Sequence, residues 1–359
     1  MKKLLHITEC LGSGVLNYIK NITSWQVKDY DVYIAYATRP ETPPNFMQQF
    51  DYRVHFIYVE GFTREIELKN DLKAFINVRK IIRNIQPDLI HLHSTKAGVI
   101  GRWAINCKKY MVFYSPHAYS FLMCDCGITK RFLYKTIEKL SDRKQCLTVT
   151  DIDSELIASR KVTKNAICIA NGIDYVELDG LCKRAVALIH KNTQKTICML
   201  GKIVPQKNPE LFNEIAQEFP KVIFMWIGAG PLANKLTSSN IQITGWLDRV
   251  EAVAKMMSAD IFLFPSAWES LSMALMEAMY LEKPCIVSRA DGNRDIIHTG
   301  INGYVCDTKE EYIAAISELL NDKEKIIEYG KRSRQDILNI YNINTMQNRY
   351  EKLFSDKGL

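Results

Sequence analysis

No run of apolar residues in this sequence reaches the roughly 18 residues that a membrane-spanning helix needs. The chain contains no helix-turn-helix, RNA-recognition or zinc-finger pattern, which excludes the common nucleic-acid-binding modules. Its ten cysteines are scattered through predicted strands and helices, as is typical of buried thiols in a reducing compartment. We therefore expect a cytoplasmic globular protein with no nucleic-acid partner.

Spacings typical of metal ligands are also missing. Cys124 and Cys126 lack the second cysteine pair that would complete a zinc site. His91 and His93 share one face of a predicted strand at 88–93, but no third ligand is nearby in the sequence. We interpret both histidines as packed or hydrogen-bonded side chains, and we expect no metal site and no cofactor.

Two aspartates stand at the start of a predicted helix. Asp151 and Asp153 directly follow a predicted strand at 146–150 and precede an apolar run. An aspartate in that position is typical of a helix N-cap, because its side chain accepts a hydrogen bond from a free backbone N–H group. We interpret both as capping residues.

Length and charge indicate two domains of different character. A chain of 359 residues exceeds one typical core and suits two domains of about 150–180 residues each. Residues 1–180 hold 25 lysines and arginines against 19 aspartates and glutamates, so most of the net charge of +7 lies in this half. A basic surface without a nucleic-acid motif suits a phosphorylated substrate or anionic lipid.

Predicted strands and helices alternate along the chain, which is typical of doubly wound parallel sheets in the α/β class. A first series of strands is expected at 2–8, 32–37, 54–59, 88–93, 111–116 and 146–150. A second series is expected at 196–200, 222–227, 262–264 and 284–288. We interpret the mixed stretch 175–194 between the two series as an irregular linker.

The stretch 262–280, FLFPSAWESLSMALMEAMY, predicts a buried strand, a turn and a helix. A helix that begins at the carboxyl end of a parallel strand aims free N–H groups at a ligand, and a diphosphate suits that position. Glu269 falls on the turn and Glu277 within the helix. Carboxylates accept hydrogen bonds, so we expect their partners to be hydroxyl groups of a sugar and a ribose.

Phe-Pro-Ser-x-x-Glu269, followed by seven residues and Glu277, resembles the Glu-x7-Glu signature of the retaining glycosyltransferase family 4. Further similar motifs follow the family's order over nearly the whole chain. The resemblance implies the GT-B architecture of two facing Rossmann-like domains, with a final helix that crosses back to the first. It assigns Glu269 to the donor sugar and Glu277 to the ribose. Ser270 and Ser272 depart from the family, where glycine and proline are usual.

The same resemblance assigns further residues. His117, after the predicted strand 111–116, corresponds to a histidine that contacts the donor sugar. Lys202 and Lys207 lie on a glycine-led loop that suits a diphosphate, although Lys202 replaces the family's arginine. The expected catalytic residues are therefore His117, Lys202, Lys207 and Glu269. The other expected donor-binding residues are Gly12, Gly14, Gly201, Gly228, Gly230, Ser270, Leu271, Ser272 and Glu277.

The resemblance also sets the expected domain limits. Residues 1–182 are expected to form an acceptor-binding domain, 183–341 a nucleotide-sugar-binding domain, and 342–359 the final helix. No acceptor-binding residue is assigned.

A basic helix is predicted at 130–145, with an inner side formed by Phe132, Leu133, Ile137 and Leu140. Its lysines and arginines are then free to face outward. We interpret this helix either as an ordinary solvated face or as a contact with anionic lipid at the inner membrane surface.

The motifs together predict a metal-independent retaining glycosyltransferase of hexosyltransferase type. We expect it to take a nucleotide-diphosphate sugar, with UDP as the expected nucleotide, and to extend a membrane-anchored glycan in capsule or O-antigen synthesis. It would bind peripherally to the inner face of the cell membrane. Two alternatives remain: a GT-B sugar-nucleotide epimerase, and a catalytically silent subunit that binds a glycan or another transferase.

Overall fold

The computed structural model describes the chain except for residues 41, 64, 123–126, 190–193 and 358–359, so Cys124 and Cys126 lie outside the described residues. The chain divides into two compact units. Unit 1 is Met1–Asn171 with Met346–Leu359, and unit 2 is Gly172–Thr345. The chain passes from unit 1 to unit 2 after Asn171, whereas the expected domain boundary lies after residue 182.

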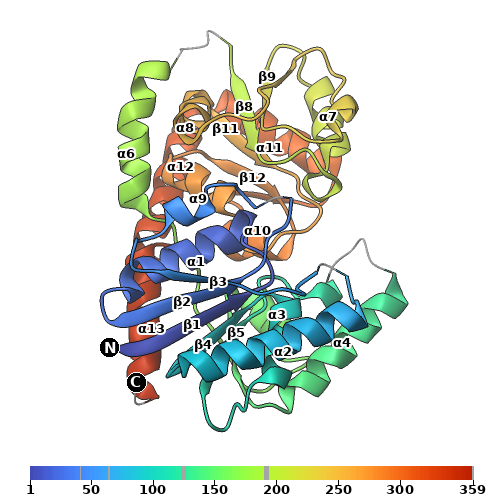
Figure 1. Cartoon of the computed structure of the whole chain (residues 1–359). Coiled ribbons are helices and arrows are strands. Elements are labelled where there is room, and N and C mark those ends of the chain that lie inside the picture. Colours follow the sequence, from blue (N-terminus) through green and yellow to red (C-terminus); the bar gives the residue numbers. More distant parts are fainter. Residues whose placement is uncertain (41, 64, 123–126, 190–193, 358–359) are drawn as a thin grey trace. The chain divides into compact units, whose positions relative to one another are not determined.

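Unit 1 is built on seven parallel strands in the order β3-β2-β1-β4-β5-β6-β7 (Figure 1). Strands β1 and β4 are almost wholly buried, as expected of a parallel sheet with both faces covered. The strands are β1 (Lys2–Thr8), β2 (Tyr30–Tyr36), β3 (His55–Tyr58), β4 (Leu89–His93), β5 (Met111–Ser115), β6 (Leu147–Thr150) and β7 (Ala166–Cys168).

The helices of unit 1 cover this sheet and include the last helix of the chain. They are α1 (Ser13–Gln26), α2 (Leu68–Ile85), α3 (Thr95–Ala104), α4 (Ile128–Asp142), α5 (Asp153–Ser159) and α13 (Ile343–Asp356), which joins unit 1 from Met346 onward. Two 3₁₀ turns are Phe46–Gln49 and Ser120–Leu122.

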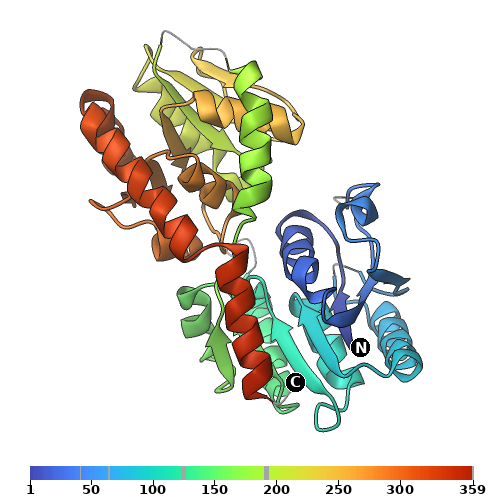
Figure 2. The same cartoon turned by 90° about the vertical axis from the view of Figure 1, so that its left-hand side faces the viewer.

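Helix α13 belongs to the core of unit 1 from Met346 onward, although unit 2 precedes that part of the helix in the sequence. The hydroxyl of Tyr350 hydrogen-bonds to the hydroxyl of Tyr18 on α1. Phe354 stacks on Phe113 of β5, with ring centroids 5.6 Å apart. Figure 2 shows α13, in red, running along this sheet. The expected final helix on the first domain is thereby confirmed.

Unit 2 has six parallel strands in the order β10-β9-β8-β11-β12-β13. The strands are β8 (Thr196–Leu200), β9 (Ile223–Ile227), β10 (Ile241–Ile243), β11 (Ile261–Phe264), β12 (Cys285–Ser288) and β13 (Gly303–Cys306). The helices are α6 (Tyr175–Ala185), α7 (Pro209–Gln217), α8 (Arg249–Ser258), α9 (Met273–Tyr280), α10 (Asp291–Ile296), α11 (Lys309–Asn321) and α12 (Lys323–Asn339). Short 3₁₀ turns are Val186–Leu188, Pro205–Lys207 and Ala233–Lys235.

The expectation of an irregular linker at 175–194 is wrong for most of that stretch, because helix α6 and the 3₁₀ turn Val186–Leu188 occupy residues 175–188. The carboxylate of Asp174 accepts hydrogen bonds from the N–H groups of Val176 and Glu177, which caps the helix. Leu178 and Leu181 are buried in the core of unit 2. The cap and these buried leucines both stabilise the helix.

The expected inner face of α4 is wrong for Phe132, Leu133 and Leu140, which are 72%, 48% and 42% exposed. The helix instead turns Glu138 inward, where its carboxylate lies 2.7 Å from Nη2 of Arg102 and accepts the Tyr114 hydroxyl at 2.9 Å. A buried ion pair thus orients the helix, and the apolar side chains remain outside. Within the described residues, no helix has the length and apolar character that a bilayer crossing requires.

Candidate functional site

Two loops of unit 2 meet at one edge of its sheet. Strands β8 and β11 pair directly, while β9 lies on the other side of β8, so the order of the strands reverses between β8 and β11. Ligands of doubly wound sheets bind in the crevice at this reversal, outside the carboxyl ends of the strands. The loop after β8 holds residues 201–207, and the loop after β11 holds residues 265–272.

Lys207 and Glu269 form an ion pair between these loops, joining Nζ to Oε1. Both side chains are largely withdrawn from solvent, with 14% and 6% exposed. The same Nζ lies 4.4 Å from the ring centroid of Phe264. Burial raises the pKa of the Glu269 carboxyl, and the charge of Lys207 opposes that rise. A cation and a carboxylate are therefore held side by side at the crevice.

The loops after β8 and β9 pack backbone against backbone. A Cβ atom at Gly228, whose φ is 141°, would lie 2.2 Å from the carbonyl oxygen of Gly201. A Cβ atom at Gly230 would lie 2.3 Å from the carbonyl oxygen of Ile203. The N–H group of Ile203 also donates to the carbonyl of Ala229 at 3.0 Å. Both expected glycines are thus required for the close approach that shapes the Lys202–Lys207 loop.

A second carboxylate–cation pair lies in unit 2. Glu277 on α9 is buried, and its Oε1 lies 2.7 Å from Nη1 of Arg249, the first residue of α8. The Arg249 side chain is 55% exposed. The two residues line a cavity of about 160 Å³ together with Gly201, Gly228 and Trp246. Three expected donor-binding residues therefore meet in one cavity, and Arg249 and Trp246 are additions to the expected set.

The start of α9 lies between these two carboxylates in the sequence. Ser272 is its N-cap, and Ser270, Leu271 and Ser272 are all partly exposed. The loop before it is fixed, because the N–H group of Gly292 donates to the carbonyl of Glu269 at 3.2 Å. Lys202 is exposed, and no ion pair with it is found among the described residues.

His117 in unit 1 lies at the carboxyl end of β5 in a strained backbone. It has φ 51° and Ala118 has φ 77°, both in a region that L-residues other than glycine rarely adopt. Its Nδ1 lies 2.7 Å from Oδ2 of Asp151, and its Nε2 lies 3.0 Å from Nδ1 of His93. Burial alone would lower the pKa of His117, but the charge and hydrogen bond of Asp151 prevail and raise it.

Asp151 is therefore not the helix cap that its position in the sequence indicates. The N-cap of α5 is Ile152, which makes no side-chain capping hydrogen bond, and Asp153 is the first residue of the helix. Strands β5 and β6 are parallel neighbours, so their carboxyl ends bring His117 and Asp151 together. This adjacency of strand ends is the signal that could have found the pair.

Glu155 on α5 also holds the strained segment. Its Oε1 accepts the N–H group of Ala118 at 2.7 Å, and its Oε2 accepts the N–H group of Asp151 at 3.3 Å. Burial and the charge of Asp151 raise the pKa of Glu155 to about 7. The segment 117–118 is thus held by two acidic side chains that lie four residues apart in the sequence.

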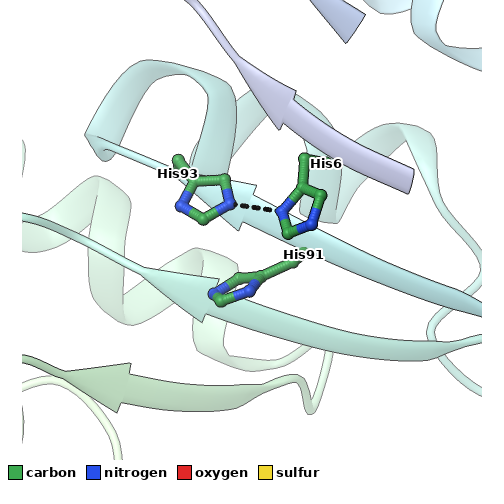
Figure 3. Close-up of side chains that lie close together, drawn as sticks. All are labelled: His6, His91 and His93. Carbon is green, nitrogen blue, oxygen red and sulfur yellow. Dashed lines mark hydrogen bonds between the residues drawn. The ribbon is translucent and has the colours of Figure 1, made fainter. Parts of the chain in front are cut away.

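His91 and His93 do have a third partner, which corrects the expectation that none is nearby. His6 of β1 lies beside both on the next strand, and all three side chains are buried (Figure 3). Nδ1 of His6 lies 2.9 Å from Nε2 of His93, and Nε2 of His91 lies 2.9 Å from the hydroxyl of Ser115. Strand pairing, which the histidine spacing alone does not specify, creates this group.

A cavity of about 520 Å³ in unit 1 opens beside His117. Its charged side chains form pairs: Nζ of Lys96 lies 2.6 Å from Oδ1 of Asp71, and Nη2 of Arg39 lies 3.5 Å from Oε1 of Glu9. Hydroxyl groups of Ser94, Thr95 and Ser120 also line it. The charged side chains of the cavity are therefore nearly balanced, and apolar side chains such as Ile66, Val99 and Ile100 line it as well.

The expected glycines after β1 play a smaller structural part. Gly12 is the N-cap of α1, and its carbonyl accepts the N–H group of Leu16 at 3.3 Å. A Cβ atom at Gly14 would meet nothing within 4 Å. Within the described residues, packing does not require glycine at position 14.

Comparison with known proteins gives the two halves their family. Residues 12–151 match the family model described as glycosyl transferase 4-like, and residues 184–336 match the model described as glycosyl transferases group 1. The first match lies within unit 1 and the second within unit 2.

Whole-chain relatives agree with both matches. The UDP-Gal:alpha-D-GlcNAc-diphosphoundecaprenol alpha-1,3-galactosyltransferase of Escherichia coli is 27% identical over 337 residues, covering 85% of each chain. The N,N'-diacetylbacillosaminyl-diphospho-undecaprenol alpha-1,3-N-acetylgalactosaminyltransferase of Campylobacter jejuni is 25% identical over 307 residues, covering 79% of this chain and 81% of the relative. HepE of Anabaena, solved in complex with UDP and glucose, shares the fold with a TM-score of 0.77 and 15% identity, covering 99% of this chain and all of HepE. The chain thus carries a glycosyl transferase 4-like domain followed by a glycosyl transferases group 1 domain, and its fold is that of the GT-B glycosyltransferases.

Proposed function

We propose that this glycosyltransferase moves a sugar from a UDP-sugar to a lipid-linked glycan during synthesis of a surface polysaccharide. The observation that carries the proposal is the pair of carboxylate–cation contacts in unit 2, Lys207–Glu269 and Arg249–Glu277. Each pair offers a donor for a phosphate oxygen and an acceptor for a hydroxyl group. Diphosphate, ribose and sugar are the parts of a nucleotide-diphosphate sugar that need these groups.

The donor is assigned to unit 2. Glu277 accepts ribose hydroxyls within the 160 Å³ cavity, and Trp246, which lines that cavity and is 70% exposed, supports the base. Lys207 and Lys202 neutralise the diphosphate, and Glu269 accepts hydroxyls of the transferred sugar. The name of the Escherichia coli relative supports a UDP-sugar donor, and the names of the Escherichia coli and Campylobacter jejuni relatives support a diphosphoundecaprenol acceptor.

The acceptor is assigned to the 520 Å³ cavity of unit 1. Its paired charges suit the hydroxyl groups of a sugar better than a bare diphosphate, because each cation already has a carboxylate partner. His117 lines this cavity, and we assign it a role at the donor sugar. The basic half of the chain supplies the surface on which a lipid-linked acceptor is presented.

Attachment to the membrane is assigned to α4. Ile128, Phe132 and Leu133 are exposed on this helix, at 85%, 72% and 48%, and basic residues of the same helix, among them Arg131 and Lys139, are exposed around them. Exposed apolar groups beside lysine and arginine are typical of helices that lie on an anionic lipid surface. The protein would then act at the inner face of the cell membrane.

Flotation with anionic and neutral liposomes tests this attachment. Phe132→Ser and Ile128→Ser should each weaken binding to anionic liposomes, while Leu338→Ser, an exposed apolar residue on α12 of unit 2, should not. Equal binding of all variants to anionic liposomes, or equal binding of the protein to anionic and neutral liposomes, would refute the role of α4.

The chemistry assigned to the site is transfer with retention of the anomeric configuration. The acceptor hydroxyl attacks the anomeric carbon on the face from which the diphosphate leaves, and a diphosphate oxygen takes its proton. Lys207 and the positive end of α9 stabilise the leaving charge, and stabilisation of that charge contributes most to the rate. Glu269 and Glu277 are each paired with a protein cation, so we propose that these cations do the work a divalent metal would do.

A transfer assay in excess EDTA tests retention and metal independence together. Proton NMR of the fresh product should show the anomeric configuration of the donor, and the rate in EDTA should equal the rate without it. An inverted product would refute retention, and an EDTA-sensitive rate would refute metal independence.

A panel of UDP-sugars and diphospholipid-linked acceptors, with products identified by mass spectrometry, tests the overall assignment. A disaccharide-lipid from one donor is the expected product. Conversion of the UDP-sugar to its epimer without acceptor would favour an epimerase, and the absence of any product would favour a silent binding subunit.

A further inference from the structure

Five buried side chains of unit 1 form one continuous line of hydrogen bonds. It begins at Asp151, whose Oδ2 lies 2.7 Å from His117, and continues over 3.0 Å to His93. Nε2 of His93 lies 2.9 Å from His6, whose Nε2 lies 2.9 Å from Oε1 of Gln26. The line therefore runs from β6 through β5, β4 and β1 to α1. Figure 3 shows its His93–His6 contact as a dashed line.

The two ends of this line fix the protons inside it. The Asp151 carboxylate can only accept hydrogen bonds. Gln26 presents its carbonyl oxygen to His6, while its Nε2 has no hydrogen-bond partner among the described residues. A neutral imidazole has one donor and one acceptor nitrogen, so three neutral imidazoles supply only three protons for four contacts. With the Gln26 oxygen facing His6, every contact is satisfied only when the line holds one further proton. With the amide turned over, its N–H group would supply the fourth proton, and all three imidazoles would be neutral with the proton on Nδ1.

We propose that this line carries one proton beyond its three neutral imidazoles, and that His93, His6 and Gln26 thereby act as positioning residues for His117. With the extra proton on His117, both of its nitrogens donate, Nδ1 to Asp151 and Nε2 to His93. His93 and His6 then each carry their proton on Nε2 and accept at Nδ1. The imidazolium and the Asp151 carboxylate together add no net charge to the interior.

The surroundings of His117 favour the extra proton at that position. Asp151, Glu155 and Glu9 all act to raise its pKa, against the effect of burial. Burial lowers the pKa of His6 to about 4, and it also lowers that of His93. The ring of Tyr18 on α1 also packs against His117, with the ring centroids 4.4 Å apart, and the Tyr18 hydroxyl bonds to Tyr350.

A metal ion is the competing explanation for three adjacent histidines. The possible ligand nitrogens of His6, His91 and His93 lie within 4.8 Å of one another, and the rings of His91 and His93 are tilted by 32° with their centroids 4.2 Å apart. The nearest nitrogens of His6 and His93 are 2.9 Å apart, which is a hydrogen-bond distance. The geometry therefore favours the hydrogen-bonded line.

What the line achieves is the placement of residue 117. Both ring nitrogens of His117 are used inside the line, so the ring is held from two sides while its backbone has φ 51°. A backbone in this region needs such support to persist. The consequence for catalysis rests on the proposed role of His117 at the donor sugar, whereas the proton count does not.

Nitrogen-15 NMR of the whole chain, labelled at histidine, measures the proton count directly. At pH 7, His6 and His93 should be neutral with the proton on Nε2, and His117 should be protonated on both nitrogens. Single His→Gln variants assign the signals, and the exposed His298 serves as internal reference. Protons on Nδ1 of His6 and His93 would overturn the proposal, as would stoichiometric zinc uptake that His91→Gln abolishes.

Variants at the far end of the line separate positioning from mere packing. Gln26→Glu adds an acceptor-only charge and should raise the pKa of His117 by about one unit. Gln26→Met removes the terminal acceptor and should lower that pKa, and should reduce kcat without changing UDP affinity. If Gln26 had a purely structural role, neither variant would change the pKa of His117. An unchanged pKa of His117 in both variants would therefore overturn the proposal. If the titrations move and kcat does not, the line stands and the donor role of His117 fails.

Discussion

Carboxylates carry much of the chemistry at the residue scale, because each has a fixed partner. Lys207 holds Glu269, Arg249 holds Glu277, and His117 holds Asp151. Removing one partner of such a pair leaves a buried charge unpaired, which costs more than the contact itself contributes. Single substitutions at these positions therefore have effects that a surface ion pair would not show.

Lys207→Met should weaken UDP binding about 10- to 100-fold, in keeping with the roughly 1.5–3 kcal/mol of a hydrogen bond to a charged group. Uridine lacks the diphosphate, so its affinity should stay unchanged. Titration calorimetry with both ligands measures this difference. Lys309→Met, which breaks an exposed pair with Glu218, is the matched control. Full UDP affinity in Lys207→Met would remove this lysine from the site.

Glu155 should make the stability of unit 1 depend on pH. Its pKa is about 7 in the folded chain against an ordinary value of 4.5, so the unfolded chain loses this proton first as pH rises. Stability from this group therefore falls as pH rises from about 4.5 to 7 and stays level above that. At about 1.36 kcal/mol per pKa unit the fall is at most about 3–4 kcal/mol.

Thermal unfolding at pH 5 and pH 8 checks this dependence. The loss of unfolding temperature between the two values should be smaller in Glu155→Gln than in the unaltered chain. Glu60→Gln, at an exposed pair with Lys73, should leave the loss unchanged. Parallel curves for all three proteins would contradict the raised pKa.

Sequence patterns nominate candidate site residues that lie within one local motif. Glu269, Glu277 and Lys207 are expected at the site because each belongs to a recognisable loop or helix start, and their roles stay a prediction. Arg249 and His6 were missed, because each gains its role only from a neighbour distant in sequence. A parallel sheet creates such neighbours through strand order, which residue spacing does not specify.

At the scale of elements, the crevice of unit 2 depends on loops that fit closely. Gly230→Ala would place a Cβ atom 2.3 Å from the carbonyl oxygen of Ile203, and the Lys202–Lys207 loop must move to accommodate it. Overpacking of this kind costs typically about 1–3 kcal/mol. We expect a lower unfolding temperature and weaker UDP binding, measured by calorimetry.

Gly180→Ala on α6 is the matched control for Gly230→Ala. A Cβ atom there meets nothing within 4 Å, and alanine favours a helix interior by roughly 0.5–1 kcal/mol. Stability should therefore rise and UDP affinity stay the same. Unchanged UDP affinity in Gly230→Ala as well would show that the glycine contact does not shape the site.

Element prediction from the sequence succeeded where local signals and tertiary packing agree. Most parallel strands were predicted, because both faces are apolar. Helix α4 was predicted with the wrong side inward, because the Arg102–Glu138 pair outweighs its apolar stripe. Helix α6 was missed, because its polar composition concealed the Asp174 cap. Both errors arise from polar contacts, which hydrophobic periodicity does not register.

At the scale of the whole molecule, the order of the chain interleaves the two units. The chain leaves unit 1 at Asn171 and returns at Met346. The last helix therefore completes the core of unit 1, whose other elements precede unit 2 in the chain. Unit 1 cannot reach its final packing until the end of the chain is present.

Tyr350→Ala should destabilise unit 1 while leaving the nucleotide site of unit 2 intact. Tyr350 is fully buried and bonds to Tyr18, so truncation leaves a cavity that costs on the order of 3 kcal/mol. Calorimetric scanning should show the transition of unit 1 at a lower temperature. UDP should still raise the transition of unit 2, since a ligand stabilises only the part that binds it. Lys352→Ala, an exposed change on the same helix, should alter neither transition. If UDP no longer raised the transition of unit 2 in Tyr350→Ala, the two units would not unfold independently.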